Sequence, residues 1–312
     1  MVELIIIGLG KMGGNLAQQA VDKGITVYGK ARSQKPELEK YGVHVFLDYK
    51  SLFNELSKPR VVYLSLPAGK IIDQVISEIT PFLEEGDVIL DGGNSFYQDS
   101  IRRESELEAK GIYFCDTGTS GGWEGARYGA CFMVGGKKEG VQIAEPILKK
   151  LAVENGYVHT GAPGTGHFVK LVHNGIEFGM LQAIGEGVSL LTASGFKLDL
   201  QKIFLNWSNG SVIRSWLVEL MEKGLREKKL SDIESYIEDT GEVNWLVQDA
   251  INKEIPTPVI SISITELMRA REMSDSDTYR AIAMMRHGFG GHPFGKSDYI
   301  SNERKTSRLA PL

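Results

Sequence analysis

The glycine pattern near the start of the chain constrains the fold more than any other feature. The run IIIGLGKMG places Gly8, Gly10 and Gly13 in the order G-x-G-x-x-G, directly after an apolar strand-like stretch and before the amphipathic stretch NLAQQAVDKG. In this setting the glycines permit a tight turn, close approach of a pyrophosphate and close packing of a helix on a strand. A purely structural turn is the alternative. The context favours a dinucleotide-binding strand–turn–helix unit.

The first half of the chain alternates short β-branched runs with helical patterns, a rhythm typical of a parallel, doubly wound sheet. The strand-like runs are ELIIIG, GITVYG, RVVYLSLP, DVILDGGN, GIYFCDTG and ACFMVGG. We therefore expect an α/β domain with a Rossmann-type, doubly wound sheet over residues 1–165.

After about Gly166 helical periodicity replaces the strand signals. It is present in FVKLVHNGIEFGMLQAIGEGVSLLTASG, LQKIFLNWSNGSVIRSWLVELMEKGL, EVNWLVQDAINKE and TYRAIAMMRHGF. We therefore expect an all-helical domain over residues 166–312. The Gly-rich stretch 159–168 is the expected hinge, and residues 296–312 have the polar composition of a loose extension.

Charge and cysteine usage exclude several classes of protein. The formal charge of -5, the pI near 5.8 and the lack of a long Lys/Arg run argue against nucleic-acid binding, so cationic groups must act locally on a small anion. Cys115 and Cys131 lie in apolar runs without C-x-x-C spacing, which predicts buried free thiols rather than a disulfide or a zinc site. We find no basic leader and no run of about 18 apolar residues, so we expect a cytoplasmic protein that contacts no membrane.

The choice of cofactor depends on the end of the second strand. A ribose 2′-hydroxyl is usually bound by an Asp or Glu about 20 residues after the glycine turn, but VYGKARSQK has no acid there. Basic side chains surround Ala31 instead, and their charge-assisted hydrogen bonds would stabilise a 2′-phosphate. We therefore predict NADP, with NAD and a merely solvated basic loop as alternatives. The predicted cofactor residues are Gly8, Gly10, Lys11, Met12, Gly13, Lys30, Arg32, Ser33, Leu66, Pro67, Ala68 and Asn94, with Lys35 beside them.

Three loops are expected beyond the carboxyl ends of the strands, where ligands of open α/β sheets gather. They are LSLPAGK, DGGNS and GTSGGWEGARYG. In the third loop, the backbone N–H groups of Ser120, Gly121 and Gly122 could bind a carboxylate. In the second, Asn94 and Ser95 could orient hydroxyl groups. Each loop is also consistent with ordinary turn chemistry.

One helical stretch, GHFVKLVHNGIEFG, carries four polar side chains on one side. Lys170, His173, Asn174 and Glu177 lie at positions i, i+3, i+4 and i+7, within an arc of about 100°. Because the other positions are mostly apolar, we expect this stripe to face a polar cavity; an exposed edge of a half-buried helix is the alternative. His173 could also be a satisfied core histidine. A carboxylate such as Glu177 is costly on a mostly buried helix unless it is paired or functional.

The combination of GLGKMG, DGGNS, SGGWEGARYG and GHFVKLVHNGIEFG closely resembles the 6-phosphogluconate dehydrogenase family, within the β-hydroxyacid dehydrogenase superfamily. WSNGSVIRSWLVEL is similar to the short-chain branch, and the resemblance extends from residue 3 to about residue 293. The wider superfamily shares the glycine turn, the S-G-G run and the Lys and Asn pair, but neither DGGNS nor the full K-x-x-H-N-x-x-E stripe. The resemblance is therefore specific to the family.

This resemblance implies the oxidative decarboxylation of 6-phospho-D-gluconate to D-ribulose 5-phosphate and CO2, with hydride transfer to NADP, as in the pentose phosphate pathway and gluconate utilization. Lys170 would be the base that accepts the C3 hydroxyl proton, so burial and neighbouring donors are expected to lower its pKa. Glu177 matches the acid that protonates C2. No metal is required, because an ammonium group serves as the electron sink. The residues that would hold the substrate are His173, Asn174, Asn94, Ser120, Gly121 and Gly122.

The same resemblance implies where the substrate's phosphate is bound. In the family an Arg and a His six residues later hold it, contributed in the long form by the neighbouring subunit. MRHGFGGHPFG has Arg286 and His292 at that spacing, and Arg269 matches another phosphate ligand. The implied assembly is a homodimer or a dimer-based oligomer, with the C-terminal tail near the neighbouring active site. His287 and His292 as a metal pair lack further ligands.

Two positions depart from the family pattern. The Tyr that follows the acid is Phe178 here, and Asn244 stands where a Lys or Arg often precedes the Trp. Both changes weaken the expected phosphate site, so a β-hydroxyacid dehydrogenase for another C6 anion, such as a sulfonate or carboxylate, is an alternative. A non-catalytic NADP-sensing protein is a third interpretation. Lys170 and Glu177 argue against it, because a sensor needs neither a base nor an acid.

Overall fold

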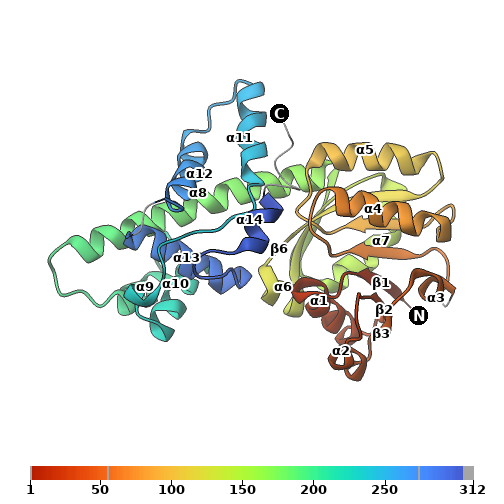
Figure 1. Ribbon diagram of the computed structural model, residues 1–312, viewed down its shortest axis with the longest axis horizontal. Helices are drawn as coiled ribbons and strands as arrows, with labels where there is room; N and C mark the ends of the chain where they lie inside the picture. Colours follow the sequence, from red (N-terminus) through yellow and green to blue (C-terminus); the bar gives the residue numbers. More distant parts are fainter. Residues whose placement is uncertain (1, 55, 273–274, 305–312) are drawn as a thin grey trace. The chain divides into compact units, whose positions relative to one another are not determined.

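The computed structural model describes residues 2–54, 56–272 and 275–304 of the chain (Figure 1). The chain divides into two compact units, Met1–Leu171 and Val172–Leu312, and each is described by itself. The division falls inside a long helix, α8 (Thr165–Ala193). The domain boundary predicted after residue 165 therefore lies next to the first residue of this helix.

Unit 1 is built on one sheet of eight strands in the order β3-β2-β1-β4-β5-β6-β7-β8. Every neighbouring pair is parallel except β6 and β7. The predicted Rossmann-type fold is confirmed, and each predicted strand-like run overlaps a strand. The strands are β1 (Glu3–Ile7), β2 (Thr26–Lys30), β3 (His44–Phe46), β4 (Val61–Leu64), β5 (Val88–Asp91), β6 (Tyr113–Ser120), β7 (Ala130–Gly135) and β8 (Ala152–Gly161).

The departures from an all-parallel sheet have simple causes. Residues 121–129, between β6 and β7, hold only the short helix α6 (Gly122–Tyr128). A parallel pair needs a crossover of about a dozen residues or more, so β7 turns back antiparallel to β6. The sequence did not predict β3 and β8, because β3 has three residues and β8 is a polar, largely exposed strand at the sheet edge.

Helices cover both faces of the sheet in unit 1. Alternate residues of β1 belong to different apolar clusters: Leu4 and Ile6 pack with residues of α1 and α7, whereas Ile5 and Ile7 pack with residues of α3, α4 and α5. Burial on both faces explains why these strands are nearly continuous apolar runs. The helices are α1 (Lys11–Asp22), α2 (Pro36–Tyr41), α3 (Tyr49–Asn54), α4 (Lys70–Ile79), the 3-10 turn η1 (Thr80–Phe82), α5 (Tyr97–Glu108), α6 and α7 (Lys138–Leu151).

The described residues of unit 2 form helices and the segments between them, which confirms the predicted helical domain. The stretch predicted from Leu200 to Leu225 divides at residues 209–215 into two helices. A further helix, PVISISITELMR, was not predicted, because its β-branched residues are typical of strands. After α8 the helices are α9 (Leu200–Ser208), α10 (Trp216–Glu227), the 3-10 turn η2 (Leu230–Asp232), α11 (Val243–Asn252), α12 (Pro258–Arg269), α13 (Asp277–Gly290) and α14 (Asp298–Glu303).

The predicted hinge at residues 159–168 is mostly regular structure. β8 continues to Gly161 and α8 begins at Thr165, so only residues 162–164 lie between them. The predicted loose extension, residues 296–312, contains α14, while residues 305–312 lie outside the described part of the chain. Glycine and proline therefore marked a short strand-to-helix turn rather than a long linker.

The two cysteines differ, and one prediction about them is wrong. Cys115 is buried and free, as expected, but the free thiol of Cys131 is exposed. Its neighbours Ala130 and Phe132 turn toward an apolar cluster, so alternation along β7 points Cys131 to the opposite face. Among the described residues, no helix is long and apolar enough to cross a bilayer.

Candidate active site

The three glycines after β1 have three different structural roles. Gly8 has φ of 100°, and a Cβ there would lie 2.3 Å from the carbonyl oxygen of Ser65. A Cβ at Gly13 would lie 2.0 Å from the carbonyl oxygen of Gly8, so α1 packs directly on the turn. Gly10 precedes α1 and faces open space within 4 Å. With no acidic residue in the first turn of α1, this arrangement fits a dinucleotide pyrophosphate.

The remaining predicted cofactor residues lie around this turn. The backbone N–H of Ser65 donates to the carbonyl of Ile7 at 2.8 Å, so the segment after β4 runs beside the glycine turn. The ammonium group of Lys11 lies 5.2 Å from the centroid of the Trp123 ring, and Met12 is partly exposed. Leu66 and Pro67 are half-buried and Ala68 is buried. Unit 1 thus gathers segments from the first and third predicted loops at the start of α1.

The basic segment after β2 is only partly exposed. Lys30 donates a hydrogen bond to the carbonyl of Ala31 at 3.1 Å and lies 5.1 Å from the centroid of the Tyr49 ring. Burial raises the pKa of Tyr49 to about 12, so this ring stays uncharged at neutral pH. Arg32 and Ser33 are exposed, and the described residues provide no ion-pair partner for Arg32. Arg32 is thus an exposed cation just after β2.

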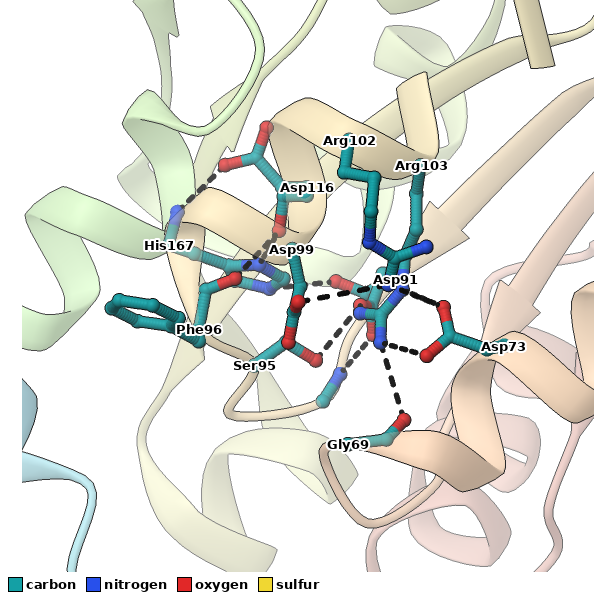
Figure 2. Close-up of polar contacts among 12 residues, drawn as sticks. Gly69, Asp73, Asp91, Ser95, Phe96, Asp99, Arg102, Arg103, Asp116 and His167 are labelled. Atoms are coloured by element: carbon teal, nitrogen blue, oxygen red, sulfur yellow. Dashed lines mark hydrogen bonds and ion pairs between the residues drawn. The ribbon is translucent and has the colours of Figure 1, made fainter. Parts of the chain in front are cut away.

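The DGGNS loop is held by a buried carboxylate that the sequence analysis did not single out. Asp91 ends β5, has no exposed surface, and accepts hydrogen bonds from the backbone N–H of Gly93 at 3.0 Å and the hydroxyl of Ser95 at 2.8 Å. Its carboxylate is also 3.3 Å from the guanidinium of Arg103 (Figure 2). The two residues that flank Asn94 are therefore fixed by one side chain.

Arg103, on α5, connects this loop to the loop after β4. Its guanidinium donates to both carboxylate oxygens of Asp73, at 2.8 and 3.2 Å, and to the carbonyl of Gly69 at 3.2 Å. Burial acts to raise the pKa of Asp73, but hydrogen bonds from Arg103 and Arg102 outweigh it, and the pKa lies below its usual value. A buried charge network thus fixes both loops.

The start of α8 lies against β6 and β7 at a distance that only glycine permits. A Cβ at Gly118 would lie 2.5 Å from the Cβ of Lys170, and one at Gly166 would lie 2.4 Å from the carbonyl oxygen of Asp116. A Cβ at Gly135 would lie 2.6 Å from the carboxylate of Asp116. Close packing therefore fixes the position of the Lys170 backbone on the sheet.

The predicted polar stripe lies on one continuous helix, α8, with Lys170 in unit 1 and the other three residues in unit 2. Lys170 and Asn174 are buried, at 9% and 5% exposure, whereas the side chain of His173 is 38% exposed. His173 is therefore not a core histidine. Its Nδ1 lies 3.1 Å from Oδ1 of Asn174 and 3.9 Å from the carboxylate of Glu177. The stripe joins a buried amine to a partly exposed histidine–carboxylate pair.

The predicted phosphate residues have different surroundings in unit 2. Arg286, on α13, is 4% exposed, donates to the carbonyl of Glu238 at 3.0 Å and lies 5.4 Å from the centroid of the Phe178 ring. Arg269 is exposed and pairs with Glu266 at 2.7 Å. Within its own chain, Arg286 thus contacts Phe178, one of the two positions that depart from the family pattern.

His292 follows the left-handed Gly291 that ends α13. Its ring meets the Phe289 ring edge-on, with the centroids 5.8 Å apart, and its carbonyl lies 2.8 Å from Nδ1 of His287. The described residues contain no group of three or more His, Cys, Asp or Glu side chains that could hold a metal ion. His287 and His292 are thus linked through a backbone carbonyl.

Comparison with known proteins agrees with this arrangement. The sequence model for the NAD binding domain of 6-phosphogluconate dehydrogenase matches residues 3–161, and that for its C-terminal domain matches residues 166–305. The chain is 34% identical over 302 residues to the NAD(+)-dependent, decarboxylating 6-phosphogluconate dehydrogenase of Haloferax volcanii, covering 95% of this chain and 100% of that protein. It is 44% identical over 292 residues to YqeC of Bacillus subtilis, covering 92% and 97%; the naming of YqeC as a 6-phosphogluconate dehydrogenase is itself provisional.

Solved structures give the same result. The 6-phosphogluconate dehydrogenase of Plasmodium falciparum superposes with a TM-score of 0.79 at 30% identity, covering 86% of this chain and 62% of that one. A 3-hydroxyisobutyrate dehydrogenase of Mycobacterium tuberculosis shares the fold, with a TM-score of 0.70 over 92% of this chain and 99% of that one, at 23% identity. The fold and the glycine turn define an NAD(P)-dependent oxidoreductase. Within that class, the chain belongs to the 6-phosphogluconate dehydrogenase family and has its short form.

Proposed function

We propose that this protein catalyses the oxidative decarboxylation of 6-phosphogluconate to ribulose 5-phosphate and CO2, with NADP as the hydride acceptor. The observation that carries the proposal is the stripe on α8, where the buried amine of Lys170 is followed two turns later by the carboxylate of Glu177. A base and an acid on one helix suit a reaction that removes a proton and later returns one. Membership of the family supports the same substrate class.

In the proposed mechanism Lys170 accepts the proton of the C3 hydroxyl while hydride leaves C3. The turn of Gly8, Gly10 and Gly13 would hold the pyrophosphate of the dinucleotide, whose nicotinamide would supply the hydride acceptor. Lys170 must be uncharged at this point, and a buried amine loses the water that stabilises its charged form. The resulting ammonium group polarises the new C3 carbonyl. The C1–C2 bonding electrons then form an enediol as CO2 departs.

Glu177 completes the reaction by donating a proton to C2 of the enediol while Lys170 takes the proton of the C3 hydroxyl, which gives the ketose. Its carboxylate lies 3.9 Å from Nδ1 of His173, close enough for an ion pair with a protonated ring. Asn174 and Asn94 would hold the substrate hydroxyls, and Ser120 and the N–H groups of Gly121 and Gly122 the carboxylate.

The phosphate would lie near the turn of α8 that carries Phe178. Arg286 is buried beside that ring, and the described residues give it no carboxylate partner, so a bound anion would compensate its charge. Its planar fork suits bidentate recognition of phosphate. We propose His292 and Arg269 as further ligands, with Arg269 exchanging its surface pair with Glu266 for the substrate.

The proposal of NADP is supported by the exposed Arg32 and by the lack of an acid after β2. The Haloferax relative is NAD(+)-dependent, so the test must compare both nucleotides. Charge-assisted hydrogen bonds from Arg32 would favour the 2′-phosphate. Ser33 and Lys35 extend the same segment.

We also propose a homodimer formed through the helical unit. Large apolar side chains are exposed there, and burying them against a second subunit would remove apolar surface from water. They include Ile176, Leu190, Phe196, Val212, Val259 and Ile262. Light scattering after size-exclusion chromatography should give twice the mass of the chain, and a monomer at micromolar concentration would contradict the proposal.

Phe178 favours one alternative, a gluconate with a different anion at C6. The ring has no hydroxyl for a phosphate oxygen, and its face is already covered by Arg286 at 5.4 Å. A smaller or planar anion, such as a carboxylate, needs fewer donors than a phosphate. Comparing 6-phosphogluconate with glucarate tests this alternative directly.

The primary test is the initial rate of nicotinamide reduction with 6-phosphogluconate, with NADP and NAD at matched concentrations and released CO2 counted alongside. We expect NADP reduction with one CO2 for each nucleotide reduced. A faster reaction with NAD would overturn the cofactor proposal alone. No reduction with either nucleotide, despite measured NADP binding, would overturn the substrate.

A further inference from the structure

The start of α8 is fastened to the sheet by buried polar groups that have no part in the proposed chemistry. Asp91 ends β5, and Asp116 lies in the neighbouring parallel strand β6, directly opposite Asp91 in register. Neither side chain has exposed surface. Two adjacent buried carboxylates are costly unless other groups compensate them. Each has a separate set of donors (Figure 2).

Asp116 holds the backbone of the first turn of α8. Its two carboxylate oxygens accept hydrogen bonds from the N–H groups of Gly164 and His167, each at 2.7 Å. These N–H groups have no partner within a helix, and a negative charge at this end is favoured by the helix dipole. A residue of β6 thus caps a helix that begins far along the chain.

The side chain of His167 forms the second attachment. It is 1% exposed, with Nε2 3.0 Å from the carbonyl oxygen of Asp91 and Nδ1 2.7 Å from the hydroxyl oxygen of Ser100. Because a carbonyl can only accept, Nε2–H donates to the carbonyl of Asp91, and Nδ1 shares a hydrogen bond with the hydroxyl of Ser100. One imidazole therefore joins β5, α5 and α8.

Asp91 contacts both segments of unit 1 that would meet the substrate, the loop around Asn94 and the first turn of α8. Its carboxylate fixes Gly93 and Ser95, on either side of Asn94, and its carbonyl holds His167. Lys170 follows His167 by three residues, so both lie on the same side of α8. The distance between the Lys170 amine and the Asn94 loop is therefore set through Asp91.

We infer that His167 is a positioning residue for Lys170, an inference that rests on the proposed function. It touches neither the reacting atoms nor the cofactor site described above. Its ring holds the first turn of α8 at the depth and rotation that direct Lys170 toward the proton it removes. A displacement of about 1 Å at such a group can cost about 100-fold in rate.

The test compares two substitutions at His167. His167→Leu removes both ring nitrogens, whereas His167→Gln keeps an amide N–H that can still donate to the carbonyl of Asp91. For His167→Leu we expect kcat per folded molecule to fall by about 10- to 100-fold, with KM for the sugar acid and Kd for the nucleotide changed less than about threefold. His167→Gln should recover most of the lost kcat.

Two further variants separate positioning from general loss of structure. Ser100→Ala removes the hydroxyl partner of Nδ1 and should lower kcat by a smaller factor than His167→Leu. His159→Leu is the matched control, because Nε2 of His159 also lies within hydrogen-bond distance of backbone carbonyls, those of Gly136 and Gly161, at 3.1 and 2.9 Å. This histidine lies on β8 and is not part of the network around α8, so its loss should leave kcat unchanged.

The outcomes distinguish this inference from the proposed function. If the wild-type protein oxidises the sugar acid and His167→Leu retains its kcat, the positioning role is wrong while the function stands. Equal losses of kcat in His167→Leu and His167→Gln, together with a rise in KM for the sugar acid, would likewise overturn it. If the wild-type protein oxidises no sugar acid, the proposed function is wrong and the role of His167 falls with it.

Discussion

The buried arginine beside the end of β5 in unit 1 and the buried arginine of the helical unit differ in their partners. Arg103, on α5, is enclosed by the carboxylates of Asp73 and Asp91 and by the carbonyl of Gly69. Arg286, on α13, is buried to a similar degree but has an aromatic ring and one carbonyl instead. A buried arginine paired with carboxylates, such as Arg103, holds the loops around it in place. A buried arginine without a carboxylate partner, such as Arg286, is suited to bind an anionic ligand.

The acids next to Arg286 show that this difference is local. Glu238 gives Arg286 only its backbone carbonyl, while its carboxylate pairs with Arg304. The carboxylate of Asp239 lies 3.4 Å from Arg271. Both nearby carboxylates are therefore occupied by other arginines, which leaves the guanidinium of Arg286 for the proposed phosphate. The following substitutions test whether paired and unpaired buried cations differ as this comparison requires.

The largest effect is expected at a third buried basic side chain, that of Lys170. Lys170→Met removes the proposed base but keeps a long apolar side chain, so turnover should fall by about 100- to 10,000-fold, the usual contribution of a general base. Nucleotide affinity should stay nearly unchanged, as measured by fluorescence titration. Normal turnover in this variant would show that another group accepts the C3 proton.

Arg103→Met should lower stability rather than affinity. It leaves Asp91 buried without its cation, and breaking a buried pair typically costs about 3–5 kcal/mol. Urea unfolding gives the change in the free energy of unfolding. The matched control is Arg102→Met on the same helix, since Arg102 is 43% exposed and a surface pair contributes about 1 kcal/mol or less. Equal losses in both variants would mean that the buried network does not act as a scaffold.

Arg286→Ala should show the opposite behaviour. We expect KM for the phosphorylated substrate to rise by about 10- to 100-fold, since a hydrogen bond to a charged group contributes about 1.5–3 kcal/mol. Nucleotide affinity should not change, and the free energy of unfolding should fall less than in Arg103→Met. Arg226→Ala, an exposed arginine of α10 that pairs with Glu222, serves as the control. An unchanged KM would exclude Arg286 as a phosphate ligand.

The sequence predicted what depends on local spacing. The turn of Gly8, Gly10 and Gly13 could be predicted because its three glycines lie within six residues of one another. The stripe from Lys170 to Glu177 could be predicted from helical periodicity. The sequence did not predict that His167 contacts Asp91, because these residues are 76 positions apart. His167 does continue the stripe one turn earlier, which is the signal that could have drawn attention to it.

The roles of Asp91 and Asp116 could not be predicted from the sequence, for a different reason. Asp91 opens DGGNS and Asp116 lies in GIYFCDTG, so both were present in the quoted motifs, but an acid at a strand end is equally consistent with a solvated turn. Only the adjacent register of β5 and β6 shows that both are buried and need separate donors. The antiparallel β7 and the exposed Cys131 likewise depend on how the strands pair.

The smallest effect is expected in the pH dependence of the free energy of unfolding. Hydrogen bonds from Arg103 and Arg102 outweigh burial and lower the pKa of Asp73 in the folded protein, so its ionised form stabilises the fold. That contribution is fully present above the unfolded pKa of about 3.9 and is lost as the pH falls through the lower folded pKa. Asp73 is 37% exposed, so solvent screening keeps the effect modest. Asp73→Asn should therefore flatten the decline of the urea midpoint as the pH falls below about 4. Asp199→Asn is the matched control, an exposed acid whose pKa is lowered by the backbone N–H of Lys202. If the urea midpoint of Asp73→Asn declines as steeply with falling pH as that of the wild-type protein, Arg103 and Arg102 do not hold Asp73 in its charged form. The loops after β4 and β5 are then held by Asp91 alone.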